Sequence, residues 1–222
     1  MSVPEMLRQT FYFLGHEIRM EWRAPFVFQS TLLYVFSAVM IGYQAFRFIE
    51  PETWNALFWV VMVFIALNSV SRSFLLESRE RMMFYYVLIH PLVIFSARLI
   101  YNVTFLFLIA IISSLAFAFF LGDMVEGKGY FLLILFLGSL SLGGTFTVIS
   151  ALASRAHNSF TMASVMGFPL VIPQLLLLID QTSAAIAGLQ LSSGYEEMLG
   201  LLSISMMTII LAFLIFPYIW RE

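Results

Sequence analysis

Six stretches of the chain are long and apolar enough to cross a lipid bilayer as helices, and they constrain the fold more than any other feature. They lie near residues 26–46, 54–71, 97–121, 130–153, 159–179 and 198–219. About 20 apolar residues span the hydrocarbon core as a helix, which satisfies its own backbone hydrogen bonds. The runs lack the period-two alternation of a membrane β-barrel. The sequence therefore predicts an all-α integral membrane protein, a single six-span domain over residues 1–222.

Composition supports this assignment and excludes several functions. The chain is 61% hydrophobic and 11% charged, whereas about a quarter of the residues in soluble domains are charged. A formal net charge of −2 argues against a nucleic-acid partner, and the absence of cysteine excludes disulfides, thiol nucleophiles and Cys metal sites. The first 25 residues lack the apolar segment and cleavage site of a signal peptide, so we expect none.

The distribution of basic residues predicts the orientation in the membrane. Of the 11 Lys and Arg residues, Arg47 and Lys128 lie on one side of the spans and the others on the side of the N-terminus. Cytoplasmic loops carry an excess of Lys and Arg. We therefore expect a multi-pass membrane protein with both termini in the cytoplasm.

Residues 1–25 have the pattern of an amphipathic helix. Apolar residues recur at spacings of three and four at Leu7, Phe11, Leu14, Ile18 and Trp22. The basic residues fall largely on other faces, as in helices that lie in the membrane interface. The sequence predicts an interfacial helix ahead of the first span, and a soluble helical arm is the alternative. The expected interfacial anchor residues are Glu17, Trp22 and Arg23.

Ser71–Pro91 is the longest polar interruption between apolar runs. Its first half is charged and its second half is aromatic and aliphatic. Exposed apolar residues beside charges mark protein contacts. The sequence predicts a cytoplasmic loop over residues 72–96 with a short amphipathic helix that docks on another protein, and a solvated loop is the alternative. The expected contact residues are Arg72, Phe74, Glu77, Arg79, Glu80, Arg81, Tyr85, Leu88 and Pro91.

Two spans contain residues that suit close packing or bending. The fourth span has a surface of small residues that includes Gly143 and Gly144, and small residues let membrane helices approach closely. The fifth span has Gly167 followed by Pro169 and Pro173, and prolines kink helices. We interpret these five residues as hinge or packing positions, with static packing and a static kink as alternatives.

Two connections on the expected outer side differ in character. Residues 122–129 approach the phosphate-binding pattern G-x-x-x-x-G-K-[ST], but Gly129 replaces the hydroxyl residue, so the segment is interpreted as a turn. Residues 180–197 are apolar for an exposed loop and too short to span twice. We expect them to form a re-entrant or surface-lying outer segment.

The spans are poor in ionisable residues, which limits the mechanisms that the chain can support alone. Arg98 is expected at a helix end, where its side chain can snorkel to the interface. Ion-coupled transporters use ionisable groups at membrane depth, and intramembrane metalloproteases need paired His and Glu on one helix face. We expect no catalytic residues and no metal site, so any transport must be driven by a source of energy outside this chain.

The order and spacing of several motifs resemble a known family. The motifs are Glu17 with Trp22-Arg23, Arg72-x-Phe74-x-x-Glu77, Tyr85-x-x-Leu88-x-x-Pro91, Leu142-Gly143 and the Pro169–Pro173 element. The layout resembles the membrane subunit of type-2 ABC exporters and, within that class, the haem exporter protein B family of cytochrome c maturation. The chain departs from the commoner pattern at residues 79–81, Arg-Glu-Arg, where many relatives have a glycine-containing acidic stretch.

The resemblance implies a non-catalytic permease subunit that works with several partners. One is a soluble ABC ATPase, in a groove of which the loop after the second span would bind as a coupling helix. The others are a haem-handling membrane protein, a periplasmic haem chaperone and a second permease half. ATP would act only through the partner, and haem would be the transported or handled ligand. Met62, Met124 and Met206 are candidate haem ligands, although methionine more often serves packing. The alternatives are a permease for a lipid, polysaccharide or drug, and a non-transport scaffold for haem-protein assembly.

Overall fold

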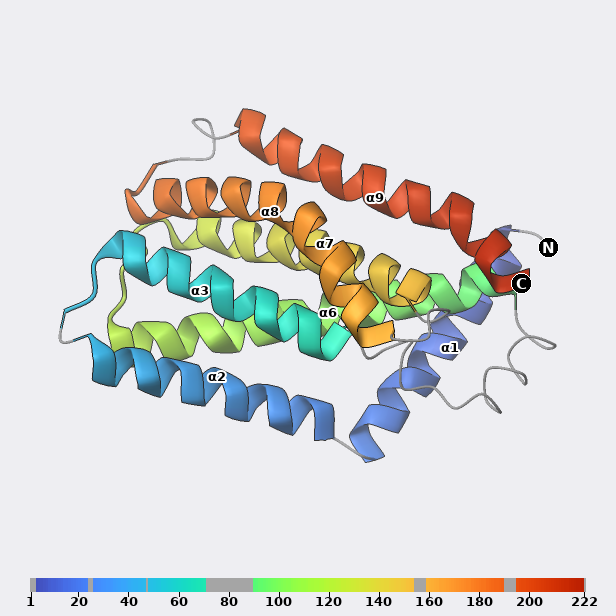
Figure 1. The fold of residues 1–222 in the computed structure, drawn as a ribbon, viewed down its shortest axis with the longest axis horizontal. Coiled ribbons are helices and arrows are strands. Elements are labelled where there is room, and N and C mark those ends of the chain that lie inside the picture. The colour runs from blue at the N-terminus through green and yellow to red at the C-terminus, as the bar shows by residue number, and fades with distance from the viewer. Residues whose placement is uncertain are drawn as a thin grey trace.

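A bundle of long helices forms the protein in the computed structural model (Figure 1). The structure describes residues 3–23, 26–46, 48–70, 90–153, 159–189 and 195–221, and these contain no strand. The helices are α1 (Val3–Arg23), α2 (Phe26–Ala45), α3 (Pro51–Ile65) with its π-helical continuation η1 (Ala66–Val70), α6 (Pro91–Leu121), α7 (Lys128–Ala153), α8 (Ser159–Ile186) and α9 (Tyr195–Arg221).

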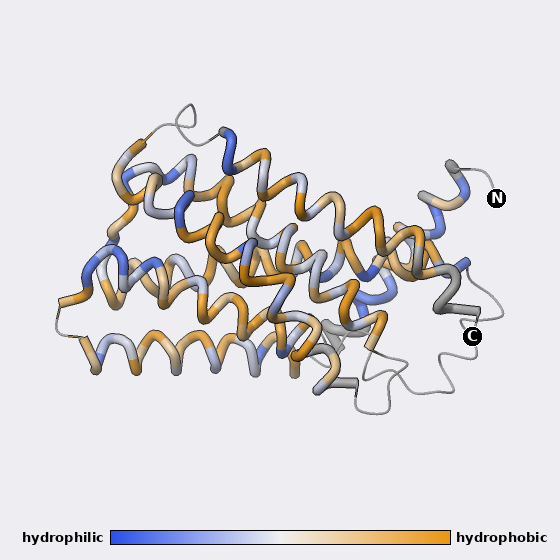
Figure 2. Tube along the Cα trace, turned by 45° about the horizontal axis from the view of Figure 1, so that its top comes forward, coloured by the Kyte–Doolittle hydropathy of each residue, from blue (hydrophilic) through white to orange (hydrophobic). Residues whose placement is uncertain are grey.

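Six of these elements are long and apolar enough to cross a membrane, which confirms the predicted fold class. They are α2, α3 with η1, α6, α7, α8 and α9, in the order that the six apolar runs predict. Figure 2 shows hydrophobic residues along these helices and hydrophilic ones gathered towards the two ends of the bundle. The protein is a multi-pass membrane protein, and its outward-facing apolar side chains suit contact with lipid or with other membrane helices.

Helix α7 lies at the centre of the bundle. Of its membrane-spanning residues 78% are buried, against 22% for α2 and for α9. It contacts α6, α8 and α9 over much of its length. Small residues on several faces allow this, because neighbouring helices can approach its backbone without steric conflict.

The main apolar core is built around aromatic rings from three helices. Trp54 and Phe58 of α3 are stacked, with ring centroids 5.6 Å apart, and Phe117 of α6 meets both rings edge-on. Phe131 of α7 packs against the same two α3 rings. Such offset and edge-to-face arrangements suit the charge distribution of aromatic rings. This core fixes α3, α6 and α7 relative to one another.

A second, smaller apolar cluster joins α1 to the bundle. It contains Phe13 of α1, the start of α6, the end of α7 and the C-terminal part of α9. Helix α1 runs obliquely across the end of the bundle where both termini lie (Figure 1). We name this set the α1 cluster; its buried members are Phe13, Val93, Ile94, Phe95, Ala97, Val148, Ala151, Ala212 and Phe216.

Helix α6 starts earlier than the sequence predicts. His90 caps the helix and Pro91 is its first residue, a position where proline's missing N–H costs no hydrogen bond. Residues 91–96, predicted to belong to the cytoplasmic loop, are therefore the first turns of the helix. The predicted start of this helix, near residue 97, was therefore six residues too late, because Pro91 is the first residue of the helix.

Helix α8 ends later than the sequence predicts. It continues to Ile186, so residues 180–186 are not part of a separate outer segment but its last two turns. Within these last turns, Gln181 and Thr182 are buried and bonded to other helices. The helix is followed by a turn in which Gly188 has a φ of +70°, a conformation that favours glycine. Residues 190–194 lie outside the described part of the chain.

Candidate functional site

Most of the predicted partner-binding residues lie outside the described part of the structure. This holds for Arg72, Phe74, Glu77, Arg79, Glu80, Arg81, Tyr85 and Leu88. Pro91 is described and begins α6. The structure describes the two helix ends on either side of residues 71–89, the end of η1 and the start of α6.

The residues on both sides of this segment are buried in the bundle. Val70, at the end of η1, is fully buried in the main core. On the other flank, Val93, Ile94 and Phe95 in the first two turns of α6 are fully buried in the α1 cluster. A displacement of residues 71–89 would therefore act directly on two packed transmembrane helices.

Helix α1 presents distinct faces to different surroundings. Thr10 and Phe13 are buried against the bundle, and Leu14 is partly buried in the α1 cluster. Phe11 is 64% exposed and Ile18 42% exposed, so part of the predicted apolar face points away from the protein. The side chains of the predicted anchor residues Trp22 and Arg23 lie outside the described part, although their backbone belongs to α1.

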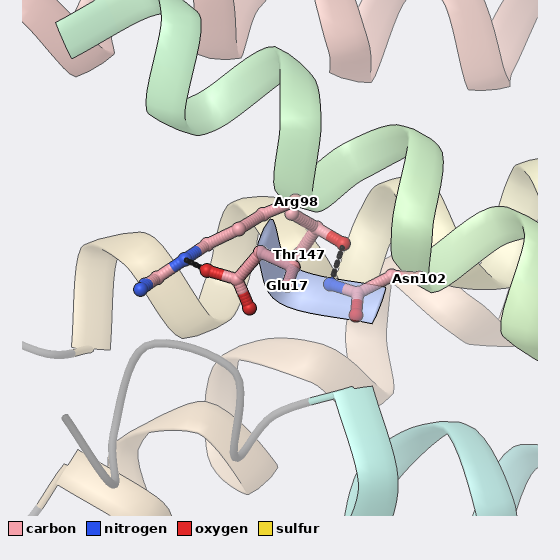
Figure 3. A network of polar contacts seen from close by, with 4 residues as sticks. All are labelled: Glu17, Arg98, Asn102 and Thr147. Atoms are coloured by element: carbon pink, nitrogen blue, oxygen red, sulfur yellow. Dashed lines mark hydrogen bonds and ion pairs between the residues drawn. The ribbon is translucent and has the colours of Figure 1, made fainter. Parts of the chain in front are cut away.

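Glu17, the third predicted anchor residue, lies next to Arg98 of α6 (Figure 3). Its Oε1 is 3.7 Å from the Arg98 Nε, and the Arg98 side chain is only 4% exposed. The expectation that Arg98 snorkels to the interface is wrong, because the helix begins seven residues earlier and its side chain turns inward to meet α1. A guanidinium at such a place requires a charged partner.

One turn further along α6, Asn102 connects α6 to α7 (Figure 3). Its side-chain amide donates to the hydroxyl of Thr147 at 2.9 Å, and that hydroxyl donates to the Gly143 carbonyl at 2.5 Å. A Cβ added at Gly143 would lie 3.3 Å from Val103 and Leu106 of α6. The two helices are therefore both in close contact and hydrogen-bonded at this level.

Of the remaining predicted hinge or packing residues, Gly144 lies at the contact of α7 with α9 and Gly167 at the contact of α8 with α7, whereas Pro169 and Pro173 are exposed on α8. A Cβ at Gly144 would be 3.2 Å from Ile209, and one at Gly167 would be 3.0 Å from Phe146. Pro169 and Pro173 both lie inside α8. Figure 1 shows α8 changing direction along its length, as proline in a helix interior predicts.

Gln174, next to the second proline, makes a polar contact that the sequence analysis did not use. Its buried amide donates to the Thr145 hydroxyl of α7 at 2.8 Å. An isolated polar residue within the apolar run LVIPQLLLL was the signal that could have identified it. The contact joins α7 to α8 one residue after Pro173.

A second group of buried polar contacts lies at the opposite end of the bundle. Gln181 of α8 accepts a hydrogen bond from the Tyr130 hydroxyl and donates to the Glu197 carboxylate at 2.5 Å. The Trp59 indole donates to the Thr182 hydroxyl at 2.9 Å. Helices α3, α7, α8 and α9 are thus tied together at this end, opposite to the α1 cluster.

The surface at this same end carries exposed carboxylates. They are Glu50, Glu52, Asp123, Glu126, Asp180, Glu196 and Glu197. Lys128 donates a hydrogen bond to Asp123 at 2.7 Å, which holds the pKa of the Asp123 carboxyl below its ordinary value. The residues that approached the phosphate-loop pattern form a short connection here, and Lys128 is already the first residue of α7.

The candidate haem ligands differ in their surroundings. Met62 is 1% exposed within the main core, and Met124 is partly buried against it. Met206 of α9 is 46% exposed. Among the described residues there is no group of three or more His, Asp or Glu side chains that could hold a metal ion.

A comparison with known protein families finds one match. The family model described as CcmB protein matches residues 8–218 of the chain. No curated protein and no solved structure matches it. The match includes all six membrane-spanning elements and the residues between η1 and α6.

Proposed function

We propose, from the premise that this chain belongs to the CcmB protein family, that it is the permease of an ATP-driven exporter whose motor is a separate ATPase subunit. Family membership makes the chain a haem-exporter permease of cytochrome c maturation, within an ABC transporter that has partner subunits. The ATP-driven step, the identity of the partners and the orientation in the bacterial inner membrane are our proposal. The observation that carries it is the family match, which extends over nearly the whole chain.

The proposed contact for the ATPase is the segment from Arg72 to Pro91. This segment combines charges at residues 77–81 with apolar residues at 82–88, a mixture suited to docking in a groove of another protein. The packing of η1 and α6 supports this role, because both flanks of the segment are buried. A push on the segment would act on α3 and α6 together.

The proposed orientation places this segment and both termini in the cytoplasm. Support comes from the excess of Lys and Arg on that side of the predicted spans. The acidic end of the bundle, with Asp123 and Glu197, then faces the periplasm. A periplasmic haem chaperone and a haem-handling membrane protein are the proposed partners on that side.

A second permease half is the proposed partner within the membrane. Only 22% of the α2 span and 22% of the α9 span is buried, so both helices keep wide apolar faces that lipid or another subunit could cover. Type-2 permeases need two membrane halves, and six spans supply one.

Haem, in this proposal, is held mainly by partners. All three histidines, His16, His90 and His157, fall on the proposed cytoplasmic side. An axial histidine at the outer face would therefore have to come from another protein. The work of this chain would be to change conformation and so export haem or release it from its chaperone.

Charge reversal in the proposed contact segment tests the assignment. We expect Glu77→Arg combined with Arg81→Glu to abolish co-purification of the ATPase subunit with the chain. The matched control is Glu52→Arg, which alters an exposed carboxylate at the opposite end of the bundle and should leave co-purification intact. Unchanged co-purification of the Glu77/Arg81 variant, at normal amounts in the membrane, would remove the docking assignment.

A further inference from the structure

We propose that Glu17 and Arg98 are positioning residues that make α1 move as one body with the first turns of α6. Helix α1 would then carry to the membrane surface any displacement that reaches α6 through residues 71–89. This transfer of movement rests on the proposed function, because it assumes that an ATPase acts on residues 71–89. The pairing of α1 with α6 through Glu17 and Arg98 concerns this chain alone and can be tested without the ATPase.

The ion pair is placed where it couples two elements strongly. Arg98 lies in a transmembrane helix and is 3% exposed, and Glu17 reaches it from α1. A buried guanidinium that loses its charged partner is costly, because neither lipid nor apolar side chains solvate it. Separating α1 from α6 would leave Arg98 without this carboxylate, so the ion pair stabilises the contact between the two helices.

The apolar contacts around the ion pair also hold α1 against the start of α6. Phe13, one turn before Glu17, is 6% exposed and packs in the α1 cluster with Val93, Ile94 and Ala97 of α6. This cluster is separate from the main core, in which none of the α1 side chains that the structure describes takes part. Helix α1 is thus attached to the bundle chiefly through α6 and moves with whatever moves the start of α6.

Arg98 is close to the point where force would arrive. It lies seven residues after Pro91, the first residue of α6. Two turns of helix correspond to about 10 Å, over which an α-helix transmits displacement as a rigid rod. A shift of Pro91 therefore shifts Arg98, and the ion pair passes that shift to Glu17.

The side of α1 that faces away from α6 suits the bilayer surface. Phe11 and Ile18 are exposed apolar residues, and Arg8 and Arg19 are exposed cations on the same helix. An apolar stripe beside a basic one is the pattern of helices that lie in the membrane interface. Helix α1 therefore links a buried point of α6 to the lipid headgroups.

Spin labelling of the purified chain in lipid nanodiscs tests the pairing. The chain has no cysteine, so introduced cysteines are labelled specifically. Gly15→Cys on α1 has open space around it, and Ile100 on α6 is 40% exposed. We expect a narrow distance distribution between labels at these two positions.

Substitutions at the ion pair then separate a positioning role from general packing. Glu17→Gln should broaden the distribution several-fold, and the exchange Glu17→Arg with Arg98→Glu should narrow it again. The control Arg19→Gln alters an exposed cation of α1 and should leave the width unchanged. A Glu17→Gln distribution as narrow as the parent's, or an exchange variant as broad as Glu17→Gln, would overturn the pairing.

The same labels in the complex with the ATPase subunit test the movement. On nucleotide binding, the Gly15–Ile100 distance should stay constant, while a Gly15–Met162 distance from α1 to α8 should change. A change in the first distance as large as in the second would overturn the one-body proposal. If neither the Gly15–Met162 distance nor an Ile100–Met162 distance changes on nucleotide binding, the ATP-driven function is contradicted. That result would leave the pairing of Glu17 with Arg98 in the chain alone unaffected.

Discussion

The indole ring of Trp59 in α3 lies directly against the backbone of Gly138 in α7. A Cβ added at Gly138 would come within 2.4 Å of a ring atom of Trp59, a distance that no stable packing tolerates. The same indole donates a hydrogen bond to Thr182 of α8, so the ring cannot move aside without losing that bond. Three helices are thereby fixed to one another at one residue that lacks a side chain.

Replacing Gly138 should therefore destabilise the bundle. We expect Gly138→Ala to lower the free energy of unfolding by about 1–3 kcal/mol, the usual cost of overpacking a core. Unfolding in detergent with a rising fraction of denaturing detergent measures this. Gly129→Ala in the first turn of α7 is the control, because nothing lies within 4 Å of its added Cβ. Equal stability of the two variants would show that α3 and α7 are not in this close contact.

The hydrogen bond between Gln174 and Thr145 gives an asymmetric prediction. The Gln174 carbonyl oxygen is buried without a hydrogen bond, whereas its amide donates to Thr145. Thr145→Val should leave the whole buried amide unpaired and cost about 1–3 kcal/mol. Gln174→Leu removes the amide together with its unpaired oxygen and should cost clearly less. The unfolding midpoints of the two variants measure the difference, and a larger loss for Gln174→Leu would contradict the assigned contact.

The two prolines of α8 give a prediction that separates stability from activity. Pro169→Ala with Pro173→Ala restores two backbone donors to the helix interior and removes the steric cause of the kink. We expect a chain that is at least as stable but supports less haem attachment to a reporter c-type cytochrome. The reporter signal, normalised to the amount of chain in the membrane, is the measurement. Full activity of the straightened variant would mean that the bend has no functional role.

The pair of Asp123 and Lys128 gives a prediction for pH. The hydrogen bond from Lys128 lowers the pKa of Asp123, so its contribution to stability is present above the ordinary carboxyl pKa and is lost only as the pH falls through the lowered value. Both side chains are exposed, so solvent screens the interaction. Asp123→Asn should therefore leave the unfolding midpoint nearly unchanged between pH 5 and pH 8. A distinct loss of stability in that range would show that the pair is more than a surface contact.

The sequence was sufficient to predict the fold class and the order of the spans. Length and apolarity decide which segments cross a bilayer, and both are local properties of the chain. The spacing of apolar residues likewise predicted α1 as a helix over residues 1–25, as observed for Val3–Arg23.

The contacts between helices were harder to predict from the sequence, because they depend on residues that are distant in the sequence. Arg98 was expected to reach the interface because nothing local indicated that Glu17, more than 80 residues earlier, would face it. Residues 180–186 were assigned to a separate outer segment, yet they are the last two turns of α8, where Tyr130 and Trp59 bond to Gln181 and Thr182 inside the bundle. The end of a membrane helix is therefore hard to predict from the sequence where another helix supplies hydrogen-bond partners for its polar residues.

The candidate docking residues could likewise be predicted only in part from the sequence. Their residue types predicted a contact segment between the second and third spans, and Arg72 to Leu88 remain a prediction because they lie outside the described residues. Pro91, at the end of that segment, was assigned to a contact and is in fact the first residue of α6. A contact of Pro91 with the partner stays a prediction, and its place at the start of α6 would let that contact move the helix directly.

The central claim is that this permease has no source of energy of its own and is moved by a separate ATPase. The most direct measurement is haem attachment to a reporter cytochrome c in cells that carry the unaltered chain with an ATPase subunit that binds ATP but does not hydrolyse it. The account predicts a reporter without haem, although both subunits are present in normal amounts in the membrane. Normal haem attachment in these cells would contradict it and would favour a scaffold that acts without ATP hydrolysis.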